Sequence, residues 1–580
     1  MFFIIDFLKK RQAASLFLIT FLIYSPILFN NFVGDDIEVF GGNTFYYSLK
    51  NIPRLFEKGC ISNPKKVILL NGPYDIGSGG YSYRPITYLT YFIDYYFFRG
   101  KAYGSHFINI LLHCINSVLV YWIVRQIFST SALALFIGLL FSLHPIQSYA
   151  VSNCRGDLLA AMLVLFSFYF WIKFKQGGYV RRKYCFGAIM MYFFALFSKE
   201  SSFPLPFVII LFDQFLASPR LALRQRGIYY LGFISILFFY LYIYFFVYPS
   251  ASYSLNWLGG SLINHCLIMG YIWYIDLIKL LLPWTVKVVP GLYCPPVPGI
   301  VNIIEISIAF SVLITSLLVL FRSNQESMFF LLWGIIFYLP VSNLIPIVNP
   351  MADRYMYLPS IGLLIVLSVL LYKVFMPNFF DKFSKQISKI LAIGIILICV
   401  TRTVFLNEDW KSNFDLGWAC IRDYPAYYEG YAFVGKEYFD VGLFEKAKAY
   451  MEKSVLLGNK MPREVLLLAE CYVQLKEFGM AETLLKQIIQ NNPDYYEPYF
   501  YLGVIYYGQK KYWQALRVLE KTLVLNPKQP LGYILLMKVY LNLHKYEDAK
   551  IMLKKADKNL NAQERAFLYK LNFNKIQHFD

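Results

Sequence analysis

Residues 131–174 read SALALFIGLLFSLHPIQSYAVSNCRGDLLAAMLVLFSFYFWIKF. This stretch holds two apolar runs, 131–150 and 155–174, separated by a short polar turn. The hydrocarbon core of a bilayer is about 30 Å thick, and a helix of about 20 apolar residues crosses it. The stretch therefore predicts two membrane-spanning helices that form a hairpin.

The same kind of run recurs along most of the chain. Of the 580 residues, 58% are hydrophobic and only 16% are charged, with a mean hydropathy of +0.47. A soluble domain has about a quarter charged residues. The runs end near residue 406, which predicts a polytopic membrane domain of about eleven spans. The candidate spans are 13–29, 104–125, 131–150, 155–174, 184–198, 201–217, 227–248, 300–321, 327–347, 355–375 and 387–406.

The net charge of +19 fits the basic cytoplasmic loops of a membrane protein better than nucleic-acid binding. Lys9, Lys10 and Arg11 place the N-terminus in the cytoplasm, and the first apolar run, which no small-residue cleavage site follows, is expected to be a retained anchor. The apolar stretch 262–284 is ambiguous because it carries charges. The lysines at 373–389 face the cytoplasm only if this stretch does not cross, so we expect it to be interfacial or re-entrant.

Polar clusters lie beside the apolar runs, and the predicted topology places all of them at the outer face. Charges at membrane depth are costly and usually mark a functional pathway. Each cluster also has a simpler explanation, such as a solvated turn, a capping ion pair or a side chain that reaches the headgroups. Their gathering on one side favours a site. The clusters are Asp35-Asp36, Arg84-Pro85, His144-Pro145, Arg155-Gly156-Asp157, Lys199-Glu200 and Asp353-Arg354.

From residue 428 the sequence repeats with a period of 34 residues, which predicts four tetratricopeptide (TPR) units over 428–563. Such units are pairs of helices that stack into a solenoid with a concave groove suited to an extended peptide. The third unit has the TPR residues Tyr499, Leu502, Gly503, Tyr506, Ala515, Leu519 and Pro527, and similar residues stand 34 positions before and after. We expect an all-α chain with a membrane domain over 1–406, including an outer loop at 30–103, a connector over 407–427, and a terminal cap or tail over 564–580.

The nine cysteines include no CxxC pair, so neither a zinc site nor a disulfide framework is indicated. Cys60 and Cys294 both fall in predicted outer loops, so a disulfide between these two cysteines is left as an alternative.

Several short motifs, in their order along the chain, resemble the transmembrane and TPR-containing protein O-mannosyltransferases, which are multi-span glycosyltransferases of the C type. The resemblance covers nearly the whole chain. It rests on NFVGDD (31–36), YRPIT (83–87), HFIN (106–109) with His113, LHPIQ (143–147), RGDLLA (155–160), SKE (198–200) and ADRYMYLPS (352–360), together with the repeats.

The resemblance implies transfer of a mannose-like sugar from a polyprenyl-phosphate donor to a hydroxyl group of protein Ser or Thr, outside the cytoplasm. Such a transfer needs a carboxylate base and cations that hold the departing phosphate. Asp35 is the candidate base, and Asp36 would orient it or share a divalent metal ion. Candidate phosphate ligands are Arg84, Lys199 and Arg354. The supporting residues would be His144, Arg155, Asp157, Glu200 and Asp353.

Other functions stay open at this point. The chain could be a membrane anchor that displays a TPR scaffold without catalysis, or a transferase that acts on a lipid or glycan acceptor. A transporter is disfavoured because residues 1–406 show no internal repeat. The expected location is the inner or plasma membrane of a bacterium or its equivalent, with the repeats outside the cytoplasm, where they would bind the acceptor polypeptide or a partner. The sugar, the acceptor, the metal requirement and the oligomeric state do not follow from the sequence.

Overall fold

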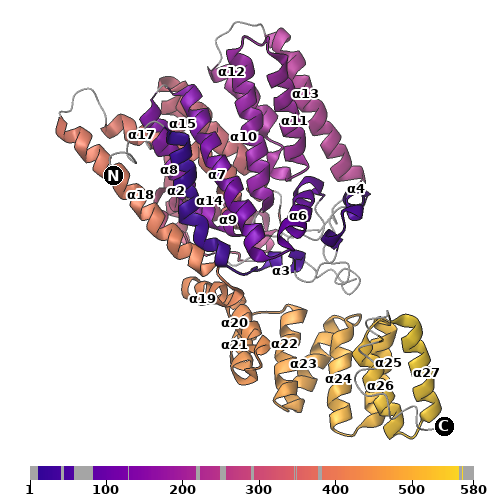
Figure 1. Cartoon of the computed structure of the whole chain (residues 1–580). Helices are drawn as coiled ribbons and strands as arrows, with labels where there is room; N and C mark the ends of the chain where they lie inside the picture. The colour runs from indigo at the N-terminus through magenta and orange to yellow at the C-terminus, as the bar shows by residue number, and fades with distance from the viewer. Residues whose placement is uncertain are drawn as a thin grey trace. The chain divides into compact units, whose positions relative to one another are not determined.

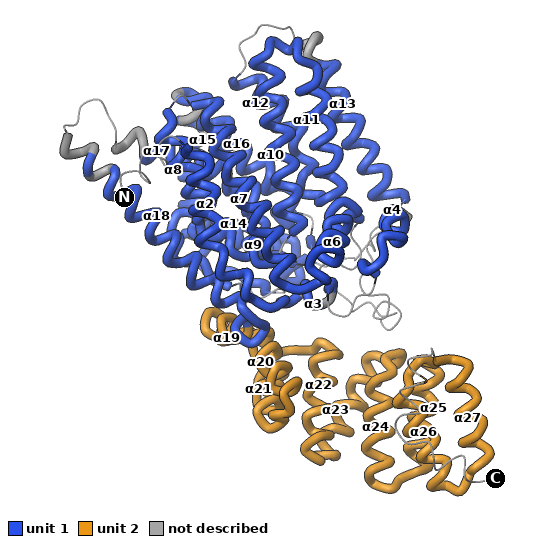
Figure 2. Tube along the Cα trace, in the orientation of Figure 1, with its two compact units in different colours: residues 1–64, 76–416 blue, residues 65–75, 417–580 orange. Residues whose placement is uncertain are grey.

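The computed structural model describes residues 11–40, 45–57, 83–128, 130–153, 155–216, 223–247, 257–288, 293–344, 346–347, 349–375, 382–560 and 565. Within these ranges the regular structure is helical throughout, which confirms the predicted all-α class. The chain divides into two compact units (Figure 2). Unit 1 comprises residues 1–64 and 76–416, and unit 2 comprises 65–75 and 417–580.

Unit 1 is a bundle of apolar helices whose positions follow the predicted spans (Figure 1). Their centre is a large buried hydrophobic cluster that includes Trp171, Phe168 and Trp333. The helices are α2 (Gln12–Tyr24), α7 (Ala102–Ile127), α8 (Ser131–Leu143), α10 (Arg155–Gln176), α11 (Arg182–Leu196), α12 (Leu205–Leu216), α13 (Leu223–Tyr242), α15 (Ile300–Ser323), α16 (Gln325–Tyr338), α17 (Tyr357–Phe375) and α18 (Lys382–Asp409).

The chain is a multi-pass membrane protein. Among the described residues, six helices are long and apolar enough to cross a bilayer, or seven if one bent pair counts as a span. Two shorter apolar segments, Ile300–Ser316 and Gln325–Val341, add to these. The number of eleven spans therefore stays a prediction.

The bent pair is the predicted span 131–150. Helix α8 ends at Leu143, and the chain continues after His144 through the 3₁₀ turn η4 (Pro145–Gln147) and helix α9 (Ser148–Asn153) with a bend of 48°. Proline has no backbone N–H and cannot continue the hydrogen-bond ladder of α8. The His144 ring accepts a hydrogen bond from the Ile146 N–H at 3.3 Å and so caps the turn.

Helix α14 (Leu262–Leu281) keeps its charges inside the protein. Lys279 pairs with Asp353 at 2.5 Å, and Asp276 accepts a hydrogen bond of 2.7 Å from the Tyr338 hydroxyl. The chain before this helix, at Gly259, lies against the chain after it, at Val297, where an added Cβ would meet Val297 at 3.2 Å. Both flanks of the segment therefore lie together, which supports a stretch that does not cross.

The predicted outer loop 30–103 contains helices of its own, α3 (Asp35–Phe40), α4 (Arg54–Glu57) and α6 (Pro85–Phe98). A mostly aromatic cluster joins them, built from Phe40, Phe45, Tyr46, Tyr91, Phe92 and Tyr95 together with Leu55 of α4. The Tyr95 hydroxyl donates to the Phe40 carbonyl at 3.0 Å and ties α6 to the end of α3. Cys60 lies outside the described residues, so the bridge to Cys294 stays untested.

Unit 2 is built from helix pairs whose first helices begin 34 residues apart, which confirms the TPR solenoid. Glycine lets paired helices approach closely, since a Cβ at Gly503 would lie 2.5 Å from Leu519. The pairs are α20 (Tyr428–Asp440) with α21 (Phe444–Leu456), α22 (Pro462–Gln474) with α23 (Phe478–Asn491), α24 (Tyr496–Gly508) with α25 (Tyr512–Leu525), and α26 (Pro530–Asn542) with α27 (Tyr546–Asn559).

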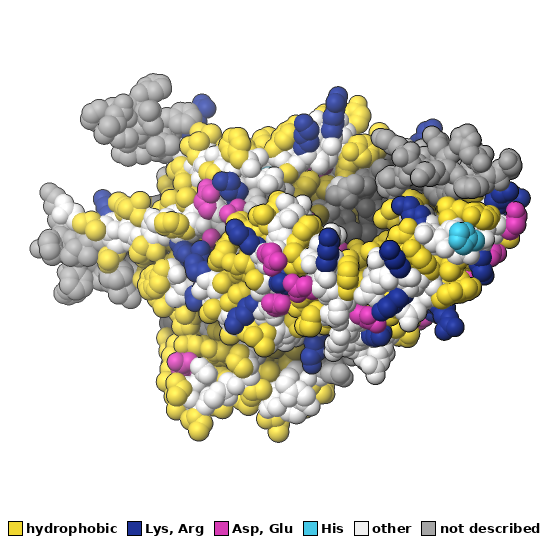
Figure 3. All heavy atoms as spheres, turned by 90° about the horizontal axis from the view of Figure 1, so that it is seen from below, with side chains coloured by type: hydrophobic (Ala, Val, Ile, Leu, Met, Phe, Trp, Pro, Cys, Tyr) yellow, Lys and Arg dark blue, Asp and Glu magenta, His cyan; other side chains and the backbone are white. Residues whose placement is uncertain are grey.

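Helix α19 (Asn413–Asp423) lies between α18 and the first pair, within the predicted connector. On the face that Figure 3 draws, basic and acidic side chains are interspersed among hydrophobic ones rather than gathered by sign. The predicted cap or tail at 564–580 lies outside the described residues apart from Arg565.

Candidate functional site

The turn between α11 and α12 carries Lys199 and Glu200, and α6 is bonded directly to it. The Ile86 N–H donates to the Phe197 carbonyl at 3.2 Å, and the Thr87 hydroxyl donates to the Ser198 carbonyl at 2.8 Å. Pro85 begins α6, where its missing N–H costs nothing. These bonds hold Arg84, which directly precedes α6, beside the turn.

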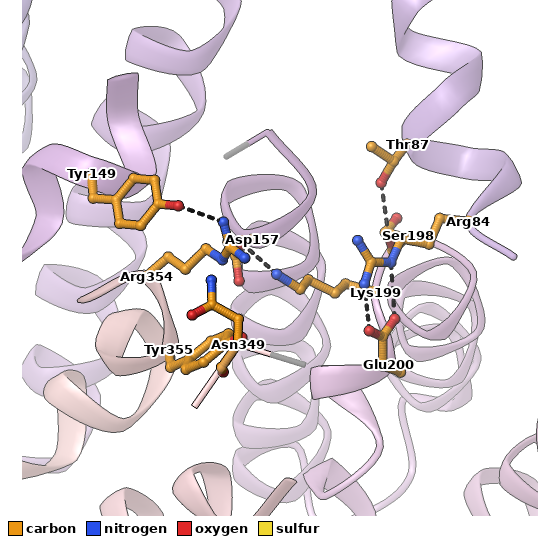
Figure 4. Close-up of polar contacts among 10 residues, drawn as sticks. All are labelled: Arg84, Thr87, Tyr149, Asp157, Ser198, Lys199, Glu200, Asn349, Arg354 and Tyr355. Carbon is orange, nitrogen blue, oxygen red and sulfur yellow. Dashed lines mark hydrogen bonds and ion pairs between the residues drawn. The ribbon is translucent and has the colours of Figure 1, made fainter. Parts of the chain in front are cut away.

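Arg84 and Glu200 form a two-bond ion pair (Figure 4). The Arg84 Nε donates to Glu200 Oε2 at 2.9 Å, and a second guanidinium nitrogen donates to Oε1. Desolvation acts to raise the pKa of the Glu200 carboxyl, but the Arg84 guanidinium outweighs it and lowers that pKa to about 2. Glu200 therefore stays ionised at neutral pH and is a poor proton acceptor.

Lys199 forms a second ion pair with Asp157, at the start of α10, with Nζ 2.5 Å from Oδ2. Both side chains are buried, at 9% and 8% exposure. Burial lowers the pKa of the Lys199 ammonium, and the Asp157 carboxylate opposes that effect. The pair is thus a buried cation and anion at the end of the bundle that also holds Arg84.

Arg354 reaches the same region from the 3₁₀ turn η10 (Asp353–Met356). It donates to the Tyr149 hydroxyl at 2.6 Å and lies over the rings of Tyr149 and Tyr355, with its guanidinium carbon 5.2 and 5.5 Å from their centroids. In Figure 4 the side chains of Arg354, Asp157 and Lys199 converge, with Asn349 beside them. The Asn349 Oδ1 is buried and has no hydrogen-bond partner in the described part of the chain.

The structure brings together five of the predicted site residues, since Lys199 interacts electrostatically with Arg84, Asp157, Glu200 and Arg354. Three cations and two carboxylates meet at one end of the bundle. The carboxylates hold two of the cations in place, which is a suitable arrangement for receiving a phosphate group.

Three other predicted residues have separate contacts. Arg155 pairs with Asp94 and donates to Asn109 at 3.1 Å and to the Ser105 hydroxyl at 2.6 Å. Asp353 pairs with Lys279, and the His144 Nε2 lies 3.3 Å from the Leu280 carbonyl. These contacts hold helices together, so a supporting role for these residues in the site stays a prediction.

The candidate bases lie on α3. The Asp35 side chain lies outside what the structure describes, whereas Asp36 is buried. Gly34 precedes the helix in the left-handed conformation, with φ of 57°, which glycine adopts at little cost. The Asn153 side chain donates to the Val33 carbonyl at 3.2 Å and fixes this turn against α9. The described residues contain no group of three or more acidic, His or Cys side chains placed to hold a metal ion.

Sequence reasoning missed several residues of the site region. Asp94 was not selected from the sequence because it lies in a helix rich in aromatic residues. A single acidic residue in an apolar run nevertheless often marks a functional position. The rings of Tyr149 and Trp410 stack at 4.6 Å with an interplanar angle of 17°. Neither residue stands in one of the motifs quoted above, and Tyr149 is one of 49 tyrosines in the chain.

Comparison with known proteins finds similarity to protein mannosyltransferases. The family model for dolichyl-phosphate-mannose-protein mannosyltransferases matches residues 90–245. A protein O-mannosyl-transferase of Caenorhabditis elegans is 23% identical over 63% of this chain and 52% of its own length. Protein O-mannosyl-transferase TMTC1 of Homo sapiens is 37% identical over 15% of this chain and 10% of its own length. The chain thus spans about half the length of the first of these relatives.

Among solved structures, MamA is similar to 31% of this chain and 95% of its own, with 21% identity and a TM-score of 0.24. A chain of the Cut9–Hcn1 hetero-tetramer of APC/C matches 82% of this chain and 83% of its own length. Its sequence identity is 14% and the TM-score is 0.24. Likenesses of this size carry no conclusion about function.

Proposed function

Because this chain is a relative of the transmembrane and TPR-containing protein O-mannosyltransferases, we propose that it is a membrane glycosyltransferase. It moves a mannose-like sugar from a polyprenyl-phosphate donor to a hydroxyl group of protein Ser or Thr. The reaction takes place on the extracytoplasmic face, and the TPR unit binds the acceptor or a partner protein.

The convergence of Arg84, Lys199 and Arg354 carries the proposal. When the bond between sugar and phosphate breaks, negative charge grows on the phosphate oxygen. Guanidinium groups bind a phosphate through paired N–H donors, and the ammonium adds a point charge. Cations already held by Glu200, Asp157 and Tyr149 need little reorganisation, and such preorganised charges lower the barrier most. Asp35 then removes the proton of the acceptor hydroxyl.

The direct test is transfer by the purified full-length chain in nanodiscs. A polyprenyl-phosphate mannose with labelled sugar is supplied together with extracytoplasmic proteins of the host, and labelled proteins are identified by mass spectrometry. We expect label on Ser or Thr side chains. Label only on lipids or glycans would favour the alternative acceptor class, and no transfer with any acceptor would favour the TPR scaffold.

The side of the membrane that the site faces is proposed from the distribution of basic residues. In α10 the site residues Arg155 and Asp157 stand in the first turn, and Lys173 and Lys175 stand in the last. Positive charge collects on the cytoplasmic side, so the opposite end, which carries the site, is taken to face outward. The Asn30 side chain donates to the Asn407 carbonyl at 3.1 Å, so α18 ends at the same outer end.

A reporter that is active only in the cytoplasm, fused after Asp580, is therefore expected to be silent. The matched control is the same reporter fused after Gly177, in the basic turn between α10 and α11, where it should be active. A strong signal from the C-terminal fusion would mean that 262–284 crosses the membrane and would overturn the proposed location of the repeats.

Removal of residues 428–580 is expected to spare donor binding and to weaken glycosylation of large acceptor proteins. TPR solenoids bind extended segments through shape and side-chain contacts, and the chemistry of the transfer belongs to unit 1. The measurement compares labelled-donor binding and transfer to a whole protein and to a short Ser/Thr peptide. Loss of donor binding in a stable, membrane-inserted truncation would contradict this division of labour.

A further inference from the structure

The end of α18 and the residues after it are bonded to the segment that leads into α3. Three contacts join parts of the chain that lie far apart in sequence. The Asn30 side chain donates to the Asn407 carbonyl at 3.1 Å, the Asn31 N–H donates to the Lys411 carbonyl at 2.9 Å, and the Gly34 N–H donates to the Asn413 Oδ1 at 3.0 Å. The last bond is made at the residue directly before Asp35.

The same short segment also contacts the phosphate-binding half of the site. Trp410 is buried and stacks on the Tyr149 ring, with centroids 4.6 Å apart. Tyr149 in turn accepts the hydrogen bond of 2.6 Å from Arg354. The indole therefore restrains the ring that orients this guanidinium.

We infer that Asn413 and Trp410 are positioning residues for the transfer reaction. Asn413 holds the turn that carries Asp35, and Trp410 holds Tyr149 and through it Arg354. The inference rests on the proposed function. Neither residue is assigned contact with a substrate, and each acts through the residue that it holds.

The geometry explains why such a device is needed. Asp35 lies on a short helix that follows a left-handed glycine, and Arg354 lies on a separate turn. Helix α9 contacts both elements, because its Asn153 donates to the Val33 carbonyl and its Tyr149 accepts from Arg354. Asn413 and Trp410 give a second support to each of these contacts, which holds the proton acceptor and the phosphate ligand in place relative to each other. A displacement of about 1 Å in a reacting group can reduce the rate by about 10²-fold.

Substitutions of Asn413 and of Trp410 are expected to change different kinetic constants. Asn413→Ala removes the acceptor of the Gly34 N–H and should lower kcat about tenfold while the donor KM stays near the wild-type value, since the base moves but the phosphate ligands do not. Asn413→Asp keeps an oxygen acceptor near the start of α19, where a negative charge is favourable, and should retain most of the activity. Trp410→Ala should raise the donor KM several-fold, and Trp410→Phe, which keeps a ring against Tyr149, should largely restore it.

Glu408→Gln is the matched control, because Glu408 is exposed on the same helical turn as Asn407 and has no place in the proposed machinery. It should behave as the wild type. If Asn413→Ala and Trp410→Ala change both constants equally, or if the conservative replacements do not rescue them, the two residues are structural only and the inference is wrong.

Amide hydrogen exchange of the full-length protein tests the inference without depending on transferase activity. In Asn413→Ala the amides of residues 31–37 should exchange faster, and in Asn413→Asp they should keep their protection. Unchanged protection in the Ala variant would overturn the inference even if the protein transfers sugar. If the wild type transfers no sugar, the proposed function fails, and altered exchange would still support the structural link itself.

Discussion

Replacement of Asp35 by Asn is expected to abolish sugar transfer while the protein still folds and binds the lipid-linked donor. A hydroxyl group is a poor nucleophile until its proton leaves, and a positioned carboxylate typically accelerates such a step about 10²–10⁴-fold. The amide keeps the size and much of the hydrogen-bonding shape of the carboxylate but cannot accept the proton. The measurement is transfer of labelled sugar by the purified variant in nanodiscs, together with donor binding.

The neighbouring Asp36 serves as the control. Successive residues of a helix point about 100° apart, so the two carboxylates of α3 cannot have the same surroundings. Asp36 is buried, and Asp36→Asn should reduce transfer less than Asp35→Asn unless both carboxylates bind one metal ion. Near wild-type transfer by Asp35→Asn would move the base elsewhere. Asp157 would then be the next candidate, since the low pKa of Glu200 makes that carboxylate a weaker choice.

The sequence predicted the architecture because each of the two units has either a strongly apolar composition or a clear repeat period. Apolar runs of the length of a bilayer mark the helices of unit 1, and a period of 34 residues marks unit 2. The structure brings five of the predicted polar residues together at one end of the bundle, and the side of the membrane that this end faces stays a prediction. The bend after Leu143 was not predicted, although Pro145 was visible in the sequence.

The pairing of charges could not be predicted in the same way. Arg84, Asp157, Lys199 and Glu200 were all recognised, but nothing in their spacing shows that Arg84 pairs with Glu200 and Lys199 with Asp157. Several pairings of two cations and two anions satisfy the same topology, and packing of α6, α10 and the turn after α11 decides between them. Contacts such as Asn413 with Gly34 are harder still, since 379 positions separate the partners and neutral polar residues carry no charge signal.

Replacement of Lys199 by Met is expected to have two separable effects. The first is on stability, because the change leaves Asp157 buried without its partner, and removal of one member of a buried ion pair costs about 3–5 kcal/mol. The second is on the reaction, because the ammonium no longer faces the departing phosphate. Loss of one preorganised charge or donor at a developing anion typically lowers the rate about 10²–10³-fold.

The double variant Lys199→Met with Asp157→Asn separates the two effects. An amide has no net charge and can be buried beside the Met side chain at a lower cost than a carboxylate, so the double variant should regain most of the lost thermal stability. It should not regain transfer, because the ammonium is still missing. Thermal unfolding in detergent gives the first quantity, and single-turnover transfer with saturating labelled donor gives the second. Recovery of both together would show that Lys199 is needed only to neutralise Asp157, and Arg84 and Arg354 would then be left as the proposed ligands of the phosphate.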